Sequence, residues 1–432
     1  MIDHTVNEPH QPGDCILFST ADWDTPYWTN KQHTAAHLGK AGWRVLYVES
    51  IGLRAPKLSS GMDWRRIAKR LWRGIQGPRK VADGIWVYSP LVIPFRHDHQ
   101  WIRALNQGLL SRRIATFIKR YSFFEPVVWT YHPFILEILY RLNVNENCKT
   151  GQLLYHCVDD LSAIPGVDAK AFNQEEVRLL QQADAVFTTS RTLYEKCLRY
   201  NPRVQNLPNV VDFEHFAGAR KPGTLPVDLE NIPKPRLTYV GALSDFKVDF
   251  SLLLEISTNN PAWQFIFIGD EREGQHDPIL AKLVSQPNVH CLGHRQYEHI
   301  PDYLRGMDVG LLPTRINEYT RSMFPMKFYE YIAAGLPVVS TPLEFTRTQK
   351  GGVFVADGAA DFTKSIGIAL QQGRLPDDVC TELVGNNTWA DRLEKMLIFA
   401  TVSRSDELKK IYPQADLYRR PSGKYTDQQR KQ

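Results

Sequence analysis

The sequence has no long apolar run, and none approaches the roughly 18–20 residues that a membrane-spanning helix requires. This absence argues against an integral membrane protein. The first residues, MIDHTVNEPHQPGD, are polar and lack the apolar core of a secretory signal peptide. No internal repeat of short, fixed period is present. We therefore expect a cytoplasmic protein, either free or attached peripherally to the inner face of the cell membrane.

The chain also lacks closely spaced cysteine pairs, and its net charge is small. Its six cysteines contain no CxxC pair and no spacing typical of a metal site; they are Cys15, Cys148, Cys157, Cys197, Cys291 and Cys380. This pattern predicts a reduced environment without a disulfide framework, and no metal. The net charge is +5 with an isoelectric point near 8.7, which is too mild to indicate nucleic acid as a partner.

The chain does have length and a regular alternation of strand and helix patterns. Its 432 residues are too many for one ordinary core and suit two large domains. Strand-like segments fall at 15–20, 43–50, 85–94, 126–134, 151–160 and 184–190, and again at 235–243, 263–270, 288–293 and 308–314. Helical patterns separate many of them, which predicts an α/β protein with two doubly wound parallel sheets facing a central cleft.

This alternation sets the predicted domain boundaries. The first domain is expected at 13–216 and the second at 236–386, joined by a linker at 217–235 rich in Pro, Gly and charged residues. A last helix at 387–402 is expected to pack back toward the first domain. The polar tail at 403–432 has few apolar residues and is predicted to be disordered.

One segment, RSMFPMKFYEYIAAGLPVVST at 321–341, combines structural and chemical signals. A helix is expected to end at a Gly that is followed by a Pro and a buried strand. Lys327 and Glu330 stand three residues apart, so they share one face of this helix. Spacing alone favours a local ion pair between them, worth a few tenths of a kcal/mol. The alternative is that Lys327 binds a phosphate and Glu330 binds a ribose diol.

Three predicted loops sit where open α/β sheets bind nucleotides, at the carboxyl ends of strands. The first, VGALSDFK, contains Gly241 and Lys247, and the second, IGDERE, contains Gly269. The third spans residues 313–327 and contains Arg321. Lysine and arginine side chains beside such loops suit a diphosphate.

These segments together resemble the group 1 (family 4) glycosyltransferases of the GT-B fold, over roughly residues 15–400. The pattern P-x-K-x-x-E-Y-x-A-x-G is matched at Pro325, Lys327, Glu330, Tyr331, Ala333 and Gly335, and NVVDFEHF (209–216) resembles a signature at the end of the family's first domain. The resemblance implies two Rossmann-like domains, a nucleotide-diphosphate sugar as co-substrate, transfer with retention of configuration, and no cofactor. Its donor-binding residues would be Gly241, Lys247, Gly269, Tyr297, Arg321, Ser322, Lys327 and Glu330.

Two positions depart from the family pattern. Ser322 replaces a glutamate that contacts the donor sugar in the family, and Ala242 replaces an arginine of the diphosphate loop. Lys327 and Arg321 can supply the charge that the second replacement removes. Because Ser322 stands where the family has the glutamate, the sequence does not predict how the donor sugar is contacted.

The first domain supplies the remaining candidates. Asp159 and Asp160 follow a strand in a VDD form that resembles teichuronic-acid-type transferases, and the alternative is that they cap a helix. With Lys327 they are the predicted catalytic residues. Asn30, His33 and His132 are predicted to face the acceptor, although a lone His is as often structural. The D-x-D at residues 22–24 suits a metal site in a different transferase fold, and we do not favour it here.

Residues 64–80, WRRIAKRLWRGIQGPRK, hold seven Lys or Arg and no acid. Apolar residues at helical spacing predict an amphipathic helix that suits an anionic membrane surface; the alternative is an ordinary helix packed on the core. A second basic helix is expected at 111–121. No nucleic-acid motif accompanies this charge.

The sequence thus predicts a metal-independent glycosyltransferase that moves a sugar from a nucleotide sugar to a glycan or polyprenyl-linked acceptor in cell-surface polysaccharide synthesis. Two alternatives stay open: a sugar-nucleotide 2-epimerase of the same fold, which needs no acceptor surface, and a non-catalytic protein that binds nucleotide sugars.

Overall fold

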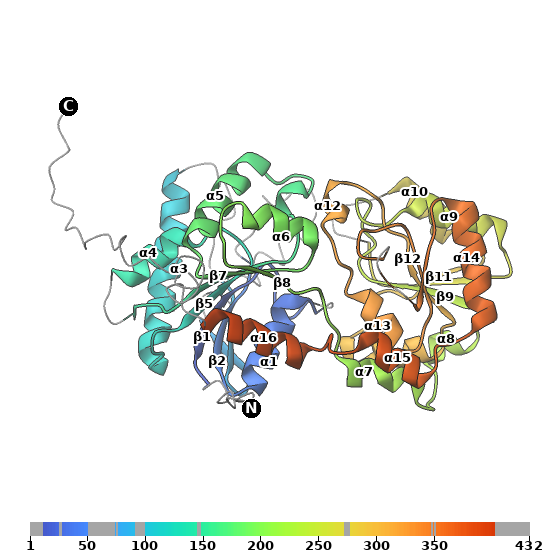
Figure 1. Ribbon diagram of the computed structural model, residues 1–432, viewed down its shortest axis with the longest axis horizontal. Helices are drawn as coiled ribbons and strands as arrows, with labels where there is room; N and C mark the ends of the chain where they lie inside the picture. Colours follow the sequence, from blue (N-terminus) through green and yellow to red (C-terminus); the bar gives the residue numbers. More distant parts are fainter. Residues whose placement is uncertain are drawn as a thin grey trace, which may run out of the picture.

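The structure is a computed structural model that describes residues 12–25, 28–50, 74, 77–90, 100–144, 148–271, 277–346, 349 and 351–401. Two sheets, each with helices around it, lie side by side (Figure 1). Among these residues, no helix combines the length and hydropathy needed to cross a membrane. The predicted tail at 403–432 lies outside the described residues, as does segment 64–80 apart from Gly74 and residues 77–80.

The first sheet has eight strands within the described residues. Their spatial order is β3 (Arg79–Ala82), β4 (Ile85–Tyr88), β2 (Arg44–Val48), β1 (Asp14–Phe18), β5 (Val127–Thr130), β6 (Leu153–Cys157), β7 (Ala185–Thr188) and β8 (Val204–Asn206). All neighbours pair in parallel except β3, which pairs antiparallel with β4 at the edge. Residues 79 and 80, predicted as the end of a basic segment, therefore lie in an edge strand.

Both faces of the first sheet are covered, which explains its continuous apolar strands. Along β1, Ile16 and Phe18 point into one core, whereas Cys15 and Leu17 point into the other. The helices of this unit are α1 (Asn30–Lys40), α3 (Gln100–Tyr121), α4 (Leu136–Asn143), the 3-10 helix η2 (Leu161–Ala163), α5 (Ala169–Gln182) and α6 (Arg191–Leu198). The second predicted basic helix lies within α3, with its apolar residues buried and its basic residues exposed.

The second sheet has six described strands, all pairing in parallel. Their order is β11 (Val289–Cys291), β10 (Gln264–Ile268), β9 (Arg236–Val240), β12 (Val309–Leu312), β13 (Val338–Ser340) and β14 (Val353–Val355). Its helices are α9 (Phe250–Asn259), α10 (Pro278–Val284), η4 (Tyr297–His299), α11 (Ile300–Arg305), α12 (Glu318–Arg321), α13 (Lys327–Ala333), α14 (Ala359–Gln372) and α15 (Asp377–Val384).

The segment predicted as a linker, 217–235, is folded. It follows α7 (Phe213–Ala217) and contains η3 (Gly218–Arg220) and α8 (Val227–Glu230). Leu229 and Ile232 are buried in the core of the second unit. A segment rich in Pro and Gly can therefore pack when a few apolar side chains are spaced to reach the core. The domain boundaries themselves stay predictions.

The last helix, α16 (Trp389–Thr401), crosses back beneath the first sheet (Figure 1). Leu393, Met396 and Leu397 join the apolar cluster that includes Leu17 of β1. Arg203 also donates a hydrogen bond to the Phe399 carbonyl at 2.6 Å. The two units are thus connected twice along the chain.

Candidate active site

Several predicted residues, which come from both units, lie within electrostatic range of helix α1. Lys31, in the first turn of α1, interacts electrostatically with Asp159 after β6 and with Lys247 after β9. His33 of α1 likewise interacts electrostatically with Lys327 on α13. A direct contact also joins the units: the Thr192 hydroxyl on α6 donates to the Glu344 carboxylate at 2.7 Å. The site is therefore shared between the units.

Lys327 and Glu330 occupy the first turn of α13. The Lys327 ammonium donates a hydrogen bond to the Glu330 carboxylate, so the local ion pair is present. The pair is not a solvated one, since Glu330 is 2% exposed. A buried carboxylate needs a partner, and the single lysine leaves acceptor capacity for further hydroxyls. Gly335, at φ 82°, ends this helix before β13, as predicted.

The loop after β9 is held by a contact from α13. The backbone N–H of Val240 donates to the Tyr331 hydroxyl at 2.8 Å. Gly310 of β12 allows the ring to approach, because a Cβ there would lie 2.5 Å from Tyr331 Cδ2. Gly241 follows at φ 152°, a conformation that other residues rarely adopt. Tyr331 thus positions the loop that carries Lys247.

The loops after β9 and β10 are tied together. The Gly241 N–H donates to the Ile268 carbonyl at 3.0 Å, and the Leu243 N–H donates to the Asp270 backbone carbonyl at 2.9 Å. Gly269 between them has φ 153°. The Lys247 ammonium lies 4.9 Å from the centroid of the Tyr319 ring on α12. Two predicted donor loops and α12 therefore form one surface.

Ser322 and Arg321 close α12 but point to different surroundings. Ser322 is 2% exposed, and its hydroxyl donates to the Tyr319 carbonyl at 2.8 Å, which leaves its lone pairs as acceptors. Arg321 is exposed. A donor-sugar contact at Ser322 stays a prediction.

Tyr297 takes part in contacts between the units. Its ring stacks on His215 at 4.4 Å and on Trp28 of the first unit at 6.0 Å. Burial and then the charge of Glu330 raise the pKa of Tyr297. Both stacking partners are protein rings, so the predicted role of Tyr297 in donor binding stays a prediction.

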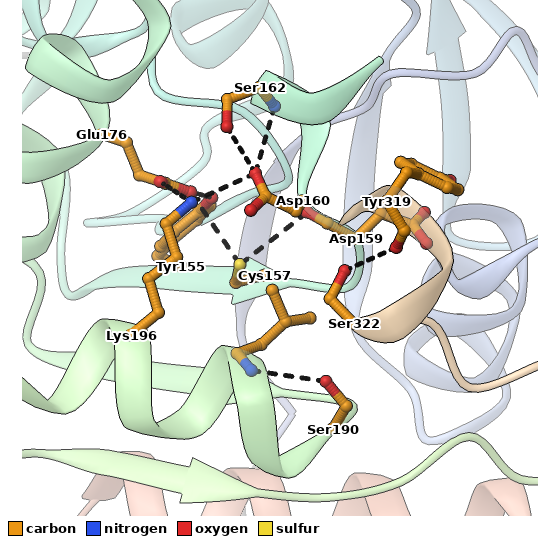
Figure 2. A network of polar contacts seen from close by, with 11 residues as sticks. Tyr155, Cys157, Asp159, Asp160, Ser162, Glu176, Ser190, Lys196, Tyr319 and Ser322 are labelled. Carbon is orange, nitrogen blue, oxygen red and sulfur yellow. Dashed lines mark hydrogen bonds and ion pairs between the residues drawn. The ribbon is translucent and has the colours of Figure 1, made fainter. Parts of the chain in front are cut away.

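The two aspartates after β6 differ in their surroundings (Figure 2). The Asp160 carboxylate accepts from the Ser162 N–H and hydroxyl at 3.2 and 2.6 Å, and from Lys196 at 3.2 Å. It therefore caps η2, which was the alternative reading of this residue. Asp159 lies on the side of Tyr319 and Ser322 of α12 (Figure 2). Of the pair, Asp159 is the better candidate for substrate contact.

The predicted acceptor-side residues are all buried. Asn30 donates to Asn209 Oδ1 at 3.0 Å and accepts from Arg392 at 2.6 Å. His33 stacks on Trp389 at 4.7 Å. His132 is 1% exposed, and burial lowers its pKa to about 4. Packing accounts for Asn30 and His33 as they stand; their contact with an acceptor stays a prediction.

Lys31 was not identified from the sequence. It is 7% exposed, between Asn30 and His33. The only available signal was its place in TNKQH at the start of a helix after the first strand. In the part of the chain that the structure describes, no group of three His, Cys, Asp or Glu side chains could hold a metal ion.

Comparison with known proteins supports the resemblance. Residues 234–372 match the family model described as Glycosyl transferases group 1. TuaH of Bacillus subtilis (strain 168), assigned by inference to teichuronic acid biosynthesis as a glycosyltransferase, is 28% identical over 217 residues. That match covers 47% of this chain and only 54% of TuaH, so it spans about half of each protein.

Solved structures show the fold over nearly the whole chain. Sucrose-phosphate synthase from Thermosynechococcus elongatus superposes with a TM-score of 0.61 at 15% identity, covering 94% of this chain and 99% of that one. Anabaena HepE in complex with UDP-glucose gives 0.58 at 13% identity, covering 89% and 99%. The chain thus has the GT-B fold, and its residues 234–372 match the group 1 glycosyltransferase model, in line with the resemblance seen in the sequence.

Proposed function

We propose that this protein is a glycosyltransferase that moves a sugar from a nucleotide-diphosphate sugar to a glycan or lipid-linked glycan in cell-surface polysaccharide synthesis, with retention of configuration. The observation that carries the proposal is that helix α1 of the first unit lies within electrostatic range of both predicted donor-binding lysines of the second unit: Lys31 interacts with Lys247, and His33 interacts with Lys327. Lys31 also interacts with Asp159, and Lys327 pairs with the buried Glu330. The nucleotide-sugar complexes of similar folds and the naming of TuaH support the donor class and the pathway.

The chemistry follows from the charges. Lys247 and Lys327 would bind the diphosphate, and their attraction grows as the bond to the sugar breaks and negative charge builds on the leaving group. Glu330 would accept the two ribose hydroxyls with the oxygen positions that Lys327 leaves open. Asp159 would face the sugar from the first unit. No metal is required in this scheme, since the lysines supply the positive charge.

Ser322 would help to set donor preference. Its hydroxyl is small and neutral where the resembled family carries a carboxylate on the donor sugar. We expect Ser322→Ala to alter the ratio of kcat/KM between donors by about threefold or more, because a lost hydrogen bond to one sugar hydroxyl is worth about 1 kcal/mol. Equal changes for all donors would argue against this role.

Binding and turnover with UDP-, GDP- and dTDP-sugars test the proposal. We expect one donor class to bind by calorimetry and to release its nucleoside diphosphate when a polyprenyl-linked glycan is added. Glu330→Ala should weaken binding by about tenfold or more, as loss of a charged hydrogen bond predicts. Glu382→Ala, at an exposed position on α15, is the matched control. The proposal fails if no donor binds, and epimer formation without an acceptor would identify an epimerase.

The first unit would contact the membrane electrostatically. Arg112, Arg113, Lys119 and Arg120 are exposed on α3, whereas Ile114, Phe117 and Ile118 of the same helix are buried in the core. This helix therefore offers charge to anionic lipids but not its apolar face. Residues 64–80 would add further basic charge.

A further inference from the structure

Lys31 is a buried cation that the proposed function has not used. Its side chain lies in the first turn of α1 and is 7% exposed. Lysines are rarely buried without a partner, because an ammonium loses hydration that only an anion or hydrogen-bond acceptors replace. An explanation for Lys31 must therefore supply such a partner.

The protein itself does not supply that partner. Among the described residues, the contact of the Lys31 ammonium is with the Tyr131 ring, whose centroid lies 5.5 Å away. No hydrogen bond or ion pair joins it to a carboxylate there, although Asp159 is near enough to act on it electrostatically. A cation–π contact replaces only part of the hydration lost on burial.

A second cation lies close by on the other unit. Burial lowers the pKa of Lys31, Asp159 opposes that effect, and Lys247 adds to it. Lys247 follows β9 of the second unit, so the two lysines belong to different units. Lys31 and Lys247 repel each other, and an anion bound between them would offset this repulsion.

We infer that Lys31 binds the diphosphate of the donor from the first unit, opposite Lys247. This inference rests on the proposed function. The acceptor is expected on the first unit, so the sugar and the β-phosphate that carries it point toward Lys31, and the α-phosphate lies deeper in the second unit. Lys31 is therefore assigned to the β-phosphate. One anion bound by lysines of both units would also couple donor binding to closure of the cleft.

Calorimetry with nucleotides that lack the sugar tests this assignment. UDP, GDP, dTDP and ADP are titrated into the full-length protein, and the tightest binder is used with its monophosphate. Lys31→Met keeps the length of the side chain and removes its charge. We expect the diphosphate to bind about ten- to a hundredfold more weakly and the monophosphate to change by less than about threefold, as for loss of one charged contact. Lys40→Met, exposed at the end of the same helix, should match the wild type.

Two further readouts separate binding from folding. Lys31→Met should unfold at the same temperature as the wild type or higher, because it removes a buried charge without a carboxylate partner. Lys31→Arg should recover most of the diphosphate affinity.

Each adverse result has its own meaning. If no nucleotide binds the wild type, the proposed function fails first. If the wild type binds and Lys31→Met retains diphosphate affinity, or loses mono- and diphosphate affinity equally, the assignment to the β-phosphate is wrong. A loss seen only with donors whose sugar carries a carboxylate would assign Lys31 to that carboxylate instead.

Discussion

The Lys327 ammonium contacts the Glu330 carboxylate one turn along α13, and Glu330 is almost completely buried. Such a pair can be structural, functional or both. Removing one partner leaves an uncompensated buried charge, whereas removing both leaves none. Comparing single and double variants of Lys327 and Glu330 therefore distinguishes a structural role of the pair from a functional one.

Lys327→Met should lower the free energy of unfolding by about 1–3 kcal/mol, because Glu330 is left without its cation. The double variant Lys327→Met, Glu330→Gln should recover most of this loss in urea denaturation. It should not recover donor affinity, which we expect to stay at least about tenfold below the wild type. Recovery of both properties together would show that the pair is structural only.

Variants of Asp159 and Asp160 should likewise distinguish a catalytic role from a structural one. Asp160→Asn weakens the cap of η2 and the contact with Lys196, so we expect thermal denaturation to show a loss of about 1–2 kcal/mol. Asp159→Asn should leave stability nearly unchanged and lower kcat by about tenfold or more. If Asp159→Asn retains full activity, that residue is not part of the reaction site.

Tyr331 offers a test of how the predicted donor loop after β9 is positioned. Tyr331→Phe removes the acceptor of the buried Val240 N–H, so we expect a loss of about 1–2 kcal/mol in stability. The donor KM should rise while the acceptor KM stays unchanged, because the loop after β9 is less well held. Gly310→Ala should be more destabilising, since its Cβ would overlap the Tyr331 ring. An unchanged donor KM in Tyr331→Phe would rule out a positioning role.

His132 predicts acid sensitivity. Burial lowers its pKa from 6.5 to about 4, so the unfolded chain binds a proton more readily than the folded one. The resulting stability is fully present above pH 6.5 and is lost as the pH falls toward about 4, by about 3 kcal/mol in total. In His132→Asn, the drop in melting temperature between pH 7.5 and pH 5 should therefore be smaller than in the wild type. An equal drop would mean that other histidines control the acid response.

Membrane attachment can be tested by flotation with liposomes. Changing Arg112, Arg113, Lys119 and Arg120 to Ser should reduce binding to vesicles rich in anionic lipid, since each basic residue near such a surface contributes about 1 kcal/mol. Neutral vesicles serve as the control and should bind neither protein. A second variant, with Arg65, Arg66, Lys69 and Arg70 changed to Ser, tests the basic segment 64–80. Equal flotation of all three proteins would contradict the membrane assignment.

Local patterns in the sequence were sufficient for most of the fold. The buried run of β1, the helix of Asn30–Lys40 and the glycine at 335 follow from propensity, period and backbone freedom, which depend on nearby residues only. The predicted donor motif likewise places Lys327 and Glu330 on one helix face. Strand β3 was missed because an edge strand of alternating polarity carries a weak signal, and the packing of Leu229 and Ile232 was hidden among Pro and Gly.

Tertiary structure alone decided which side chains share a site. Asp159 and Asp160 are adjacent in sequence, yet one caps a helix and the other lies beside α12 of the opposite unit. Lys31 and Lys247 are separated by more than two hundred residues and belong to different units, yet their charges interact. The sequence determined the elements and the chemical groups at their ends, because these depend on local forces. Burial, charge proximity and the choice between structural and chemical roles depend on long-range packing, which no local pattern contains.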